Sequence, residues 1–202
     1  MSNFTREYLT EAGATLQQIN PDAIDAVVEI VARTRTSGGR VFFLGVGGSA
    51  ANASHAVNDF RKIAEIEAYA PTDNIPELTA RANDDGWETV FSAWLRGSRL
   101  TSNDVVFVLS VSGGDRKKKL SLNIIAALDY AREVGSAIVG IVGNSDGYTA
   151  QIADACVVIP SVNSEHVTPH AEGFQAVVWH LMVSHPDLKR VRTKWEVTAQ
   201  QP

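Results

Sequence analysis

Residues 41–61, VFFLGVGGSAANASHAVNDFR, decide how this chain folds. The apolar run 41–44 predicts a buried strand, and the glycines after it predict a tight turn. Ser49 then opens a segment that predicts a helix. A strand, a glycine turn and a helix together can hold an anion, because a helix begins with unpaired N–H groups and the positive end of its dipole. His55 and Asp59 are four residues apart, so they share one face of this helix.

Composition limits the class of protein. The 202 residues are 45% hydrophobic and 20% charged, which is typical of one globular α/β domain spanning residues 1–202. A net charge of −5 argues against a nucleic-acid partner. Cys156 is the single cysteine, which excludes a disulfide within the chain. We find no signal-peptide core and no membrane-spanning stretch, and therefore expect a cytoplasmic protein without a membrane partner.

Apolar runs alternate with helical patterns along the rest of the chain. Further strands are expected near residues 66–69, 104–110, 137–142 and 156–159, with helices between them and a last helix at 169–184. This alternation predicts a three-layer α/β/α fold on a parallel sheet. The two helices expected within 1–37 cannot both bury their apolar faces on one sheet, which suggests contacts with another subunit. The tail, 187–202, is expected to be loosely held.

Two of the strands run into loops of serine and glycine, LGVGGS and LSVSGG. The carboxyl ends of parallel strands meet at one edge of a sheet, where ligands bind. Free N–H groups and serine hydroxyls there could hold a phosphate without a lysine. The alternative is that these residues only cap helices and shape loops. The spacing fits neither a dinucleotide fingerprint nor a nucleoside-triphosphate loop. The hydroxyls concerned are those of Ser49, Ser110, Ser112 and Ser121.

A second set of reactive side chains lies on the last predicted helix. Glu172 and His180 are eight residues apart, or about 80° around the helix, and could converge with His55 and Asp59. Two histidines and two carboxylates make a plausible zinc set, and a histidine with a carboxylate could instead move protons. Each could also be a solvated helix residue. We expect surface or capping roles for His166, His170 and His185, and core positions for Trp87, Trp94 and Trp179.

The segments LGVGGSAANASHAVNDF, LSVSGG and EGFQAVVWH resemble a sugar isomerase (SIS) domain, and most of all the phosphoheptose isomerases. The resemblance covers residues 3–185. It implies a flavodoxin-like, five-stranded parallel sheet and a homotetramer with active sites between subunits, often with zinc. It also implies conversion of sedoheptulose 7-phosphate to D-glycero-D-manno-heptose 7-phosphate, the first step towards nucleotide-activated heptose.

The resemblance assigns roles to individual residues. His180 and Asp59 would transfer protons through an enediol intermediate. The zinc ligands would be His55, Asp59, Glu172 and His180. The substrate would contact Gly47, Gly48, Ser49, Asn83, Asp84, Ser110, Ser112, Ser121 and Glu172.

The sequence departs from the family pattern at several of these positions. Asp59 replaces a glutamate, Glu172 a glutamine and Val111 a threonine. The serine loop is lengthened by residues 114–119, and we interpret Ser121 as its displaced serine. The added lysines could close over the anion or could form a solvated loop. The departures leave two alternatives open: a non-catalytic SIS protein that senses a sugar phosphate or binds a partner, and an isomerase of a shorter sugar phosphate.

Overall fold

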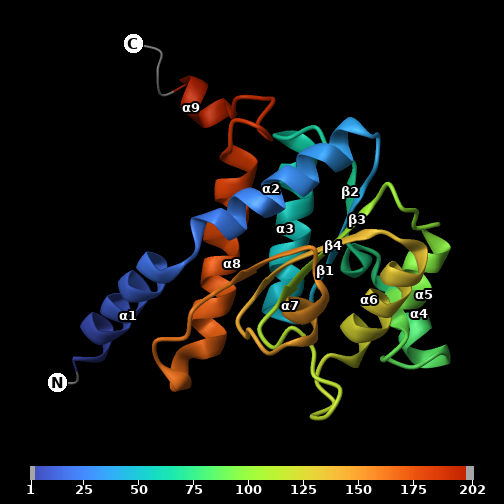
Figure 1. Ribbon diagram of the computed structural model, residues 1–202, viewed down its shortest axis with the longest axis horizontal. Coiled ribbons are helices and arrows are strands. Elements are labelled where there is room, and N and C mark those ends of the chain that lie inside the picture. Colours follow the sequence, from blue (N-terminus) through green and yellow to red (C-terminus); the bar gives the residue numbers. More distant parts are fainter. Residues whose placement is uncertain (1–2, 199–202) are drawn as a thin grey trace.

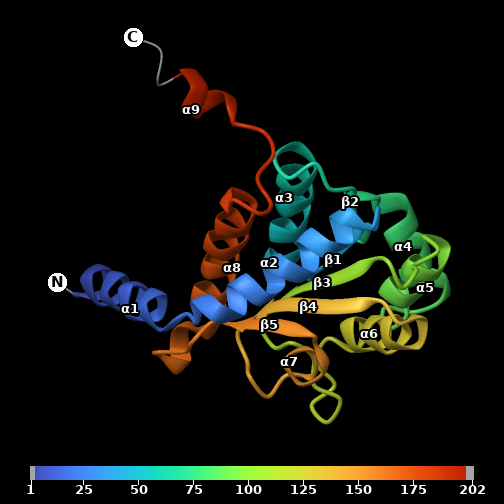
Figure 2. The same ribbon diagram turned by 45° about the horizontal axis from the view of Figure 1, so that its top comes forward.

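The computed structural model describes residues 3–198 and has a five-stranded sheet with helices on both faces (Figures 1 and 2). All strand pairs are parallel, and the order is β2-β1-β3-β4-β5. This confirms the three-layer, flavodoxin-like prediction. The strand order reverses beside β1, which places a ligand crevice at the ends of β1 and β3. The strands are β1 Val41–Leu44, β2 Ala68–Tyr69, β3 Val105–Ser110, β4 Ala137–Val142 and β5 Ala155–Val158.

The helices follow the predicted pattern closely. Asn20 caps α2 by accepting a hydrogen bond from the Asp22 amide, and Gly135 ends α6 at a positive φ of 78°. The helices are α1 Phe4–Gln18, α2 Pro21–Thr36, α3 Gly48–Lys62, α4 Ile75–Asp84, α5 Val90–Gly97, α6 Leu122–Val134, α7 Tyr148–Ile152, α8 Val167–Ser184 and α9 Lys194–Thr198. Two short 3₁₀ turns, η1 Pro71–Asp73 and η2 Ser164–His166, complete the described elements.

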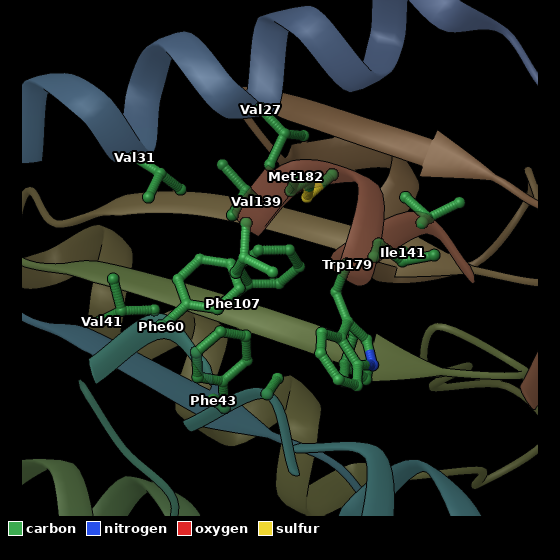
Figure 3. Close-up of a cluster of buried hydrophobic side chains, with 14 of the residues drawn as sticks. Val27, Val31, Val41, Phe43, Phe60, Phe107, Val139, Ile141, Trp179 and Met182 are labelled. Atoms are coloured by element: carbon green, nitrogen blue, oxygen red, sulfur yellow. The ribbon is translucent and has the colours of Figure 1, made fainter. Parts of the chain in front are cut away.

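One face of the sheet is covered by α2, α3 and α8 (Figure 3). Phe43 of β1 stacks on Phe107 of β3 with ring centroids 4.8 Å apart, and Phe60 of α3 meets Phe43 edge-on at 5.0 Å. Trp179 of α8 is fully buried in the same cluster. Close packing of these rings fixes α3 and α8 side by side, and these two helices carry the predicted reactive residues.

The opposite face is covered mainly by α5 and α6. Phe42 and Trp94 meet there edge-on, with ring centroids 5.5 Å apart. The core prediction is confirmed for Trp94 and Trp179 but is wrong for Trp87, which is 46% exposed. Trp87 precedes the first turn of α5, so its ring only touches Phe91 from outside.

The two leading helices differ in how they pack. The apolar stripe of α2 is buried within its own chain, against β4, β5 and α8. The apolar stripe of α2 therefore needs no second subunit, and contacts of the two leading helices with another subunit stay a prediction. By contrast, α1 buries one side chain, Thr15, and exposes Phe4, Leu9 and Leu16. Figures 1 and 2 show α1 extending away from the sheet.

The chain after α8 packs against the domain for several residues beyond the predicted end of the ordered part. Leu188 is fully buried, and its carbonyl accepts a hydrogen bond of 2.8 Å from Arg35. The amides of Arg190 and Val191 donate to the Ile63 carbonyl at 2.9 and 3.1 Å. The expectation of a loose tail from residue 187 is thus wrong for 187–191, and positions 199–202 lie outside the described residues. Within 3–198, no helix has the length and apolar character needed to cross a membrane.

Candidate active site

The glycine turn, residues 45–48, joins β1 to α3 in a shape that larger residues could not adopt. Gly47 has a φ of 61°, and a Cβ on Gly45 would lie 2.4 Å from the Ser49 carbonyl oxygen. Ser49 is 2% exposed, and its hydroxyl has no hydrogen-bond partner among the described residues. A buried hydroxyl at a helix N-terminus needs such a partner, and an anion or a water could supply it.

The serine loop, residues 110–121, brings its three hydroxyls into one small region. The Ser110 hydroxyl accepts a hydrogen bond from the Gly113 amide at 3.0 Å, and the Ser112 and Ser121 hydroxyls are 3.3 Å apart. Asp115 and Leu120 exchange two backbone hydrogen bonds of 3.0 and 2.9 Å. This pairing closes the inserted residues into a miniature hairpin, so Ser121 returns to Ser112 despite the insertion.

The basic residues of the inserted hairpin differ in their contacts. Arg116 forms hydrogen bonds of 2.6 and 2.7 Å with Asp129 of α6 and lies over the Tyr148 ring of α7. The amides of Lys117 and Lys118 donate to Asp115, and these bonds, first that of Lys118, lower the Asp115 pKa. Arg116 is therefore turned towards α6 and α7, whereas the lysine side chains are exposed. Whether the lysines close over a ligand stays a prediction.

Three of the four predicted metal ligands meet where α3 lies against α8. His55 Nε2 is 3.9 Å and His180 Nε2 is 3.7 Å from the same carboxylate oxygen, Oδ2 of Asp59. Asp59 is 14% exposed, and the two histidine side chains are about half exposed, at 57% and 48%. We call these three residues the His–Asp–His group. The carboxylate lies between two imidazole nitrogens on an open face of the molecule.

A backbone contact sets the tautomer of His180. Its Nδ1 lies 2.7 Å from the Ala176 carbonyl oxygen, which can only accept a hydrogen bond. Nδ1 therefore carries a proton and donates it, which leaves Nε2 as the nitrogen on the Asp59 side. The His180 ring also lies flat against Trp179, with centroids 3.5 Å apart. The nitrogen available to accept a proton or bind a metal is consequently Nε2.

The His–Asp–His group has the composition and spacing of a divalent metal site. Its ligand atoms all lie within 4.8 Å of one another. Tetrahedral zinc with bonds of about 2.1 Å separates its ligands by about 3.4 Å, a few tenths less than the distances to Asp59. Small side-chain rotations would close that difference, and the carbonyl contact of His180 is typical of a metal-bound histidine. His55, Asp59 and His180 could therefore hold such an ion.

Glu172, the fourth predicted ligand, lies elsewhere. Its carboxylate faces the first residue of α3, and a Cβ on Gly48 would come within 2.4 Å of Glu172 Oε2. α3 and α8 run parallel, so Glu172 meets the start of α3 while His180 meets the part nearer its end. The structure thus places Glu172 beside the glycine turn and does not bring it into the His–Asp–His group.

Asn83 and Asp84 lie at the exposed end of α4. The Asn83 side-chain amide donates to Asp84 at 2.8 Å. In the described part of the chain, no hydrogen bond joins either side chain to the glycine turn or the serine loop. Their substrate-binding role stays a prediction.

Two polar residues between α3 and α8 were not predicted from the sequence. The Asn52 side-chain amide donates to the Glu172 carbonyl at 2.9 Å and to Gln175 Oε1 at 3.0 Å. Gln175 is completely buried. The sequence signal for this contact was Gln175 itself, a polar residue in the middle of the apolar stripe of α8. These bonds fix the register of the two helices, and with it the position of Glu172.

Comparison with known proteins shows to which family the chain belongs. A model of the SIS domain matches residues 7–143. The phosphoheptose isomerase of Rhodospirillum rubrum is 32% identical over 165 residues, which cover 79% of this chain and 82% of that protein. The chain belongs to the phosphoheptose isomerase family. The resemblance inferred from the sequence motifs is therefore confirmed.

Two further proteins are similar to this chain, one in sequence and one in structure. The lincomycin biosynthesis protein LmbN of Streptomyces lincolnensis is 31% identical over 191 residues, covering 89% of this chain and 68% of that protein. The structure of phosphoheptose isomerase from Neisseria gonorrhoeae superposes with a TM-score of 0.78 over 89% of this chain and 95% of that chain. Since that pair is 24% identical, this likeness shows the shared fold.

Proposed function

We propose that this chain converts sedoheptulose 7-phosphate to D-glycero-D-manno-heptose 7-phosphate by aldose–ketose isomerisation. The observation that carries the proposal is the His–Asp–His group on α3 and α8 of a phosphoheptose isomerase family member. The group provides two nitrogen bases and a carboxylate on one open face. Isomerisation needs such groups, because one proton must leave a carbon and another must reach the neighbouring carbon.

The reaction can be written with these residues alone. A base removes a proton from C1 of the ketose while the carbonyl oxygen at C2 gains one, giving a cis-enediol. The hydroxyl at C1 then loses its proton as C2 gains one, which leaves the aldose. We assign His180 Nε2 to one proton transfer, because the other ring nitrogen is committed to the Ala176 carbonyl. We assign Asp59 to the other, because its carboxylate lies 3.7 Å from that nitrogen.

We propose that the phosphate of the substrate lies between the glycine turn and the serine loop. The donors would be the amides at the start of α3 and the hydroxyls of Ser49, Ser110, Ser112 and Ser121. Along α3, His55 lies seven residues after Gly48, or about 10 Å at 1.5 Å per residue. An extended seven-carbon chain with its phosphate has a similar length, about 10 Å. One substrate could therefore reach both places.

We propose zinc binding as an alternative use of these groups, with His55, Asp59 and His180 as the protein ligands; the lone pair of His180 Nε2 would then be bound to the ion and would no longer transfer a proton. A divalent ion bound there would polarise the carbonyl oxygen and stabilise the negative charge of the enediolate. Asp59 would then be both a ligand and a neighbour of the reacting carbons. Glu172 would contact the substrate near Gly48, where its carboxylate lies.

We further propose a homotetramer in the cytoplasm, with active sites between subunits. Val177 and Leu181 of α8 are 47% and 45% exposed and flank His180 on the helix surface. Phe4, Leu9 and Leu16 of α1 are also exposed. A second copy covering these apolar side chains would enclose the His–Asp–His group and exclude water from the reacting carbons.

The proposed activity is tested by incubating the purified chain with sedoheptulose 7-phosphate and identifying the heptose phosphates formed. We expect the seven-carbon aldose phosphate. A chain that binds sedoheptulose 7-phosphate and leaves it unchanged would instead be a non-catalytic sensor. Turnover of a shorter ketose phosphate alone would favour the isomerase of a smaller sugar.

The contact between Gly48 and Glu172 makes a prediction of its own. A methyl group in Gly48→Ala would overlap the Glu172 carboxylate, which can swing away at little cost in stability. We expect kcat/KM to fall at least about tenfold, because the substrate would lose one polar contact with Glu172. The midpoint of thermal unfolding should be unchanged. The matched control is Gly173→Ala, because a Cβ there meets no atom within 4 Å. Equal kcat/KM values for wild type and Gly48→Ala would remove Glu172 from the site.

A further inference from the structure

A second group of histidine and carboxylate side chains lies where α1 meets the start of α8. His166 Nδ1 is 2.7 Å and His170 Nε2 is 3.3 Å from Oε2 of Glu11. We call Glu11, His166 and His170 the second histidine group. Their ligand atoms lie within 4.8 Å of one another. His170 is 5% exposed, so the prediction of a surface or capping role for it is wrong.

The surroundings hold these side chains in place. The Tyr8 ring packs against His170 with centroids 4.6 Å apart and against His166 at 5.3 Å. The Asn163 side-chain amide donates to the other Glu11 oxygen, Oε1, at 2.7 Å. Asn163 is itself oriented, because its Oδ1 accepts a hydrogen bond from the Glu165 amide at 3.0 Å. Both imidazoles and the carboxylate are therefore positioned before any ligand arrives.

Two nitrogens from different turns of the chain converge on one carboxylate oxygen. The Glu11 carboxylate accepts hydrogen bonds at both of its oxygens, from His166 at 2.7 Å and from Asn163 at 2.7 Å. A metal ion would displace the proton that His166 Nδ1 donates to Glu11; the lone pairs of the two rings and this carboxylate would then make the two-histidine, one-carboxylate donor set that zinc accepts. Ligand atoms around a tetrahedral zinc ion are about 3.4 Å apart. The Glu11 carboxylate would have to move away from the two histidines by less than about 1 Å to reach that spacing.

We propose that Glu11, His166 and His170 form a second divalent metal site, separate from the His–Asp–His group, that fastens α1 to α8. A first-row ion with a preference for nitrogen, such as zinc, fits the donors. Glu11 and His166 keep 21% and 22% exposure, which leaves an opening for a water as the fourth ligand. Such a site would stabilise the position of α1, which buries a single side chain, Thr15.

Zinc binding to the full-length chain tests this site separately from the first one. The His55→Ala/His180→Gln double variant removes two ligands of the His–Asp–His group. After stripping with a chelator, we expect it to bind one zinc ion per chain in equilibrium dialysis. Adding Glu11→Gln, which keeps the size of the side chain, should weaken this binding by at least about tenfold. Adding His185→Gln, outside both groups, should change nothing. Glu11→Gln in the wild-type background should retain isomerase activity, so loss of this site and failure of the proposed function are distinguishable.

A second measurement covers the structural role. We expect zinc to slow hydrogen exchange of the α1 amides in the double variant, and Glu11→Gln to abolish that slowing. The proposal is overturned if the double variant binds no zinc at micromolar concentrations. It is also overturned if Glu11→Gln and His170→Gln, each folded by circular dichroism, bind zinc as tightly as their parent. In that case the two histidines would be hydrogen-bond donors to Glu11 only.

Discussion

His180→Gln is expected to lower kcat for sedoheptulose 7-phosphate about a thousandfold. Glutamine can still reach neighbouring polar groups, but its amide cannot act as a general acid or base near neutral pH. The loss should appear in kcat more than in KM, because the phosphate is held by the glycine turn and the serine loop. Steady-state kinetics of the purified variant measure both constants.

The expected loss does not come from unfolding. The His180 side chain is 48% exposed, so the substitution should change the free energy of unfolding by less than about 0.5 kcal/mol. Light scattering should give the same particle mass as wild type. His185→Gln is the matched control and should keep full activity. Within the described residues, the ion-pair partners of His185 are Asp25 and Asp187, and neither belongs to the His–Asp–His group. A His180→Gln variant with wild-type kcat would show that His180 moves no proton.

Asp59→Asn should be as severe, again about a thousandfold in kcat. The amide preserves the size of the side chain and removes the negative charge that faces both His55 and His180. Asp59→Glu is the more informative companion, because it restores the residue of the family pattern. The added methylene extends the carboxylate towards the two nitrogens, so we expect activity within about tenfold of wild type.

Two outcomes separate the possible roles of Asp59. If it is a metal ligand, Asp59→Asn should also bind less zinc per chain in a background that lacks the second histidine group. If it is a base alone, zinc binding should be unchanged while kcat falls. Asp25→Asn, on the exposed surface of α2, is the control for a lost carboxylate. Full activity of Asp59→Asn would contradict both roles.

The fold was predictable because its signals are local and repeated. The run 41–44, the glycine turn after it and the apolar run before Ser110 each specify an element without help from distant residues. The parallel order then follows from the alternation of strands and helices. Trp87 was mispredicted for a different reason. Helical spacing extended back from Val90 places it in the core, but α5 begins only at Val90, and the turn before it leaves the ring outside.

The site was only partly predictable because it depends on how two helices pair. The four-residue spacing of His55 and Asp59 put both on one face of α3. The position of Glu172 depends on the register between α3 and α8, which the partly buried Asn52–Gln175 bond sets and which no single helix pattern contains. His170 likewise looked like a surface residue, because its partner Glu11 is 159 positions away in the chain. The return of Ser121 to Ser112 was inferred from the motif, and the hairpin explains it.

The central claim is that this chain moves a proton between C1 and C2 of sedoheptulose 7-phosphate. The most direct measurement is incubation in deuterated water, with and without added zinc, followed by mass spectrometry and NMR of the heptose phosphates. We expect the aldose phosphate to appear with deuterium at C2, and to form about a thousandfold more slowly with His180→Gln. No product and no deuterium in the recovered ketose, under either condition, would contradict the claim.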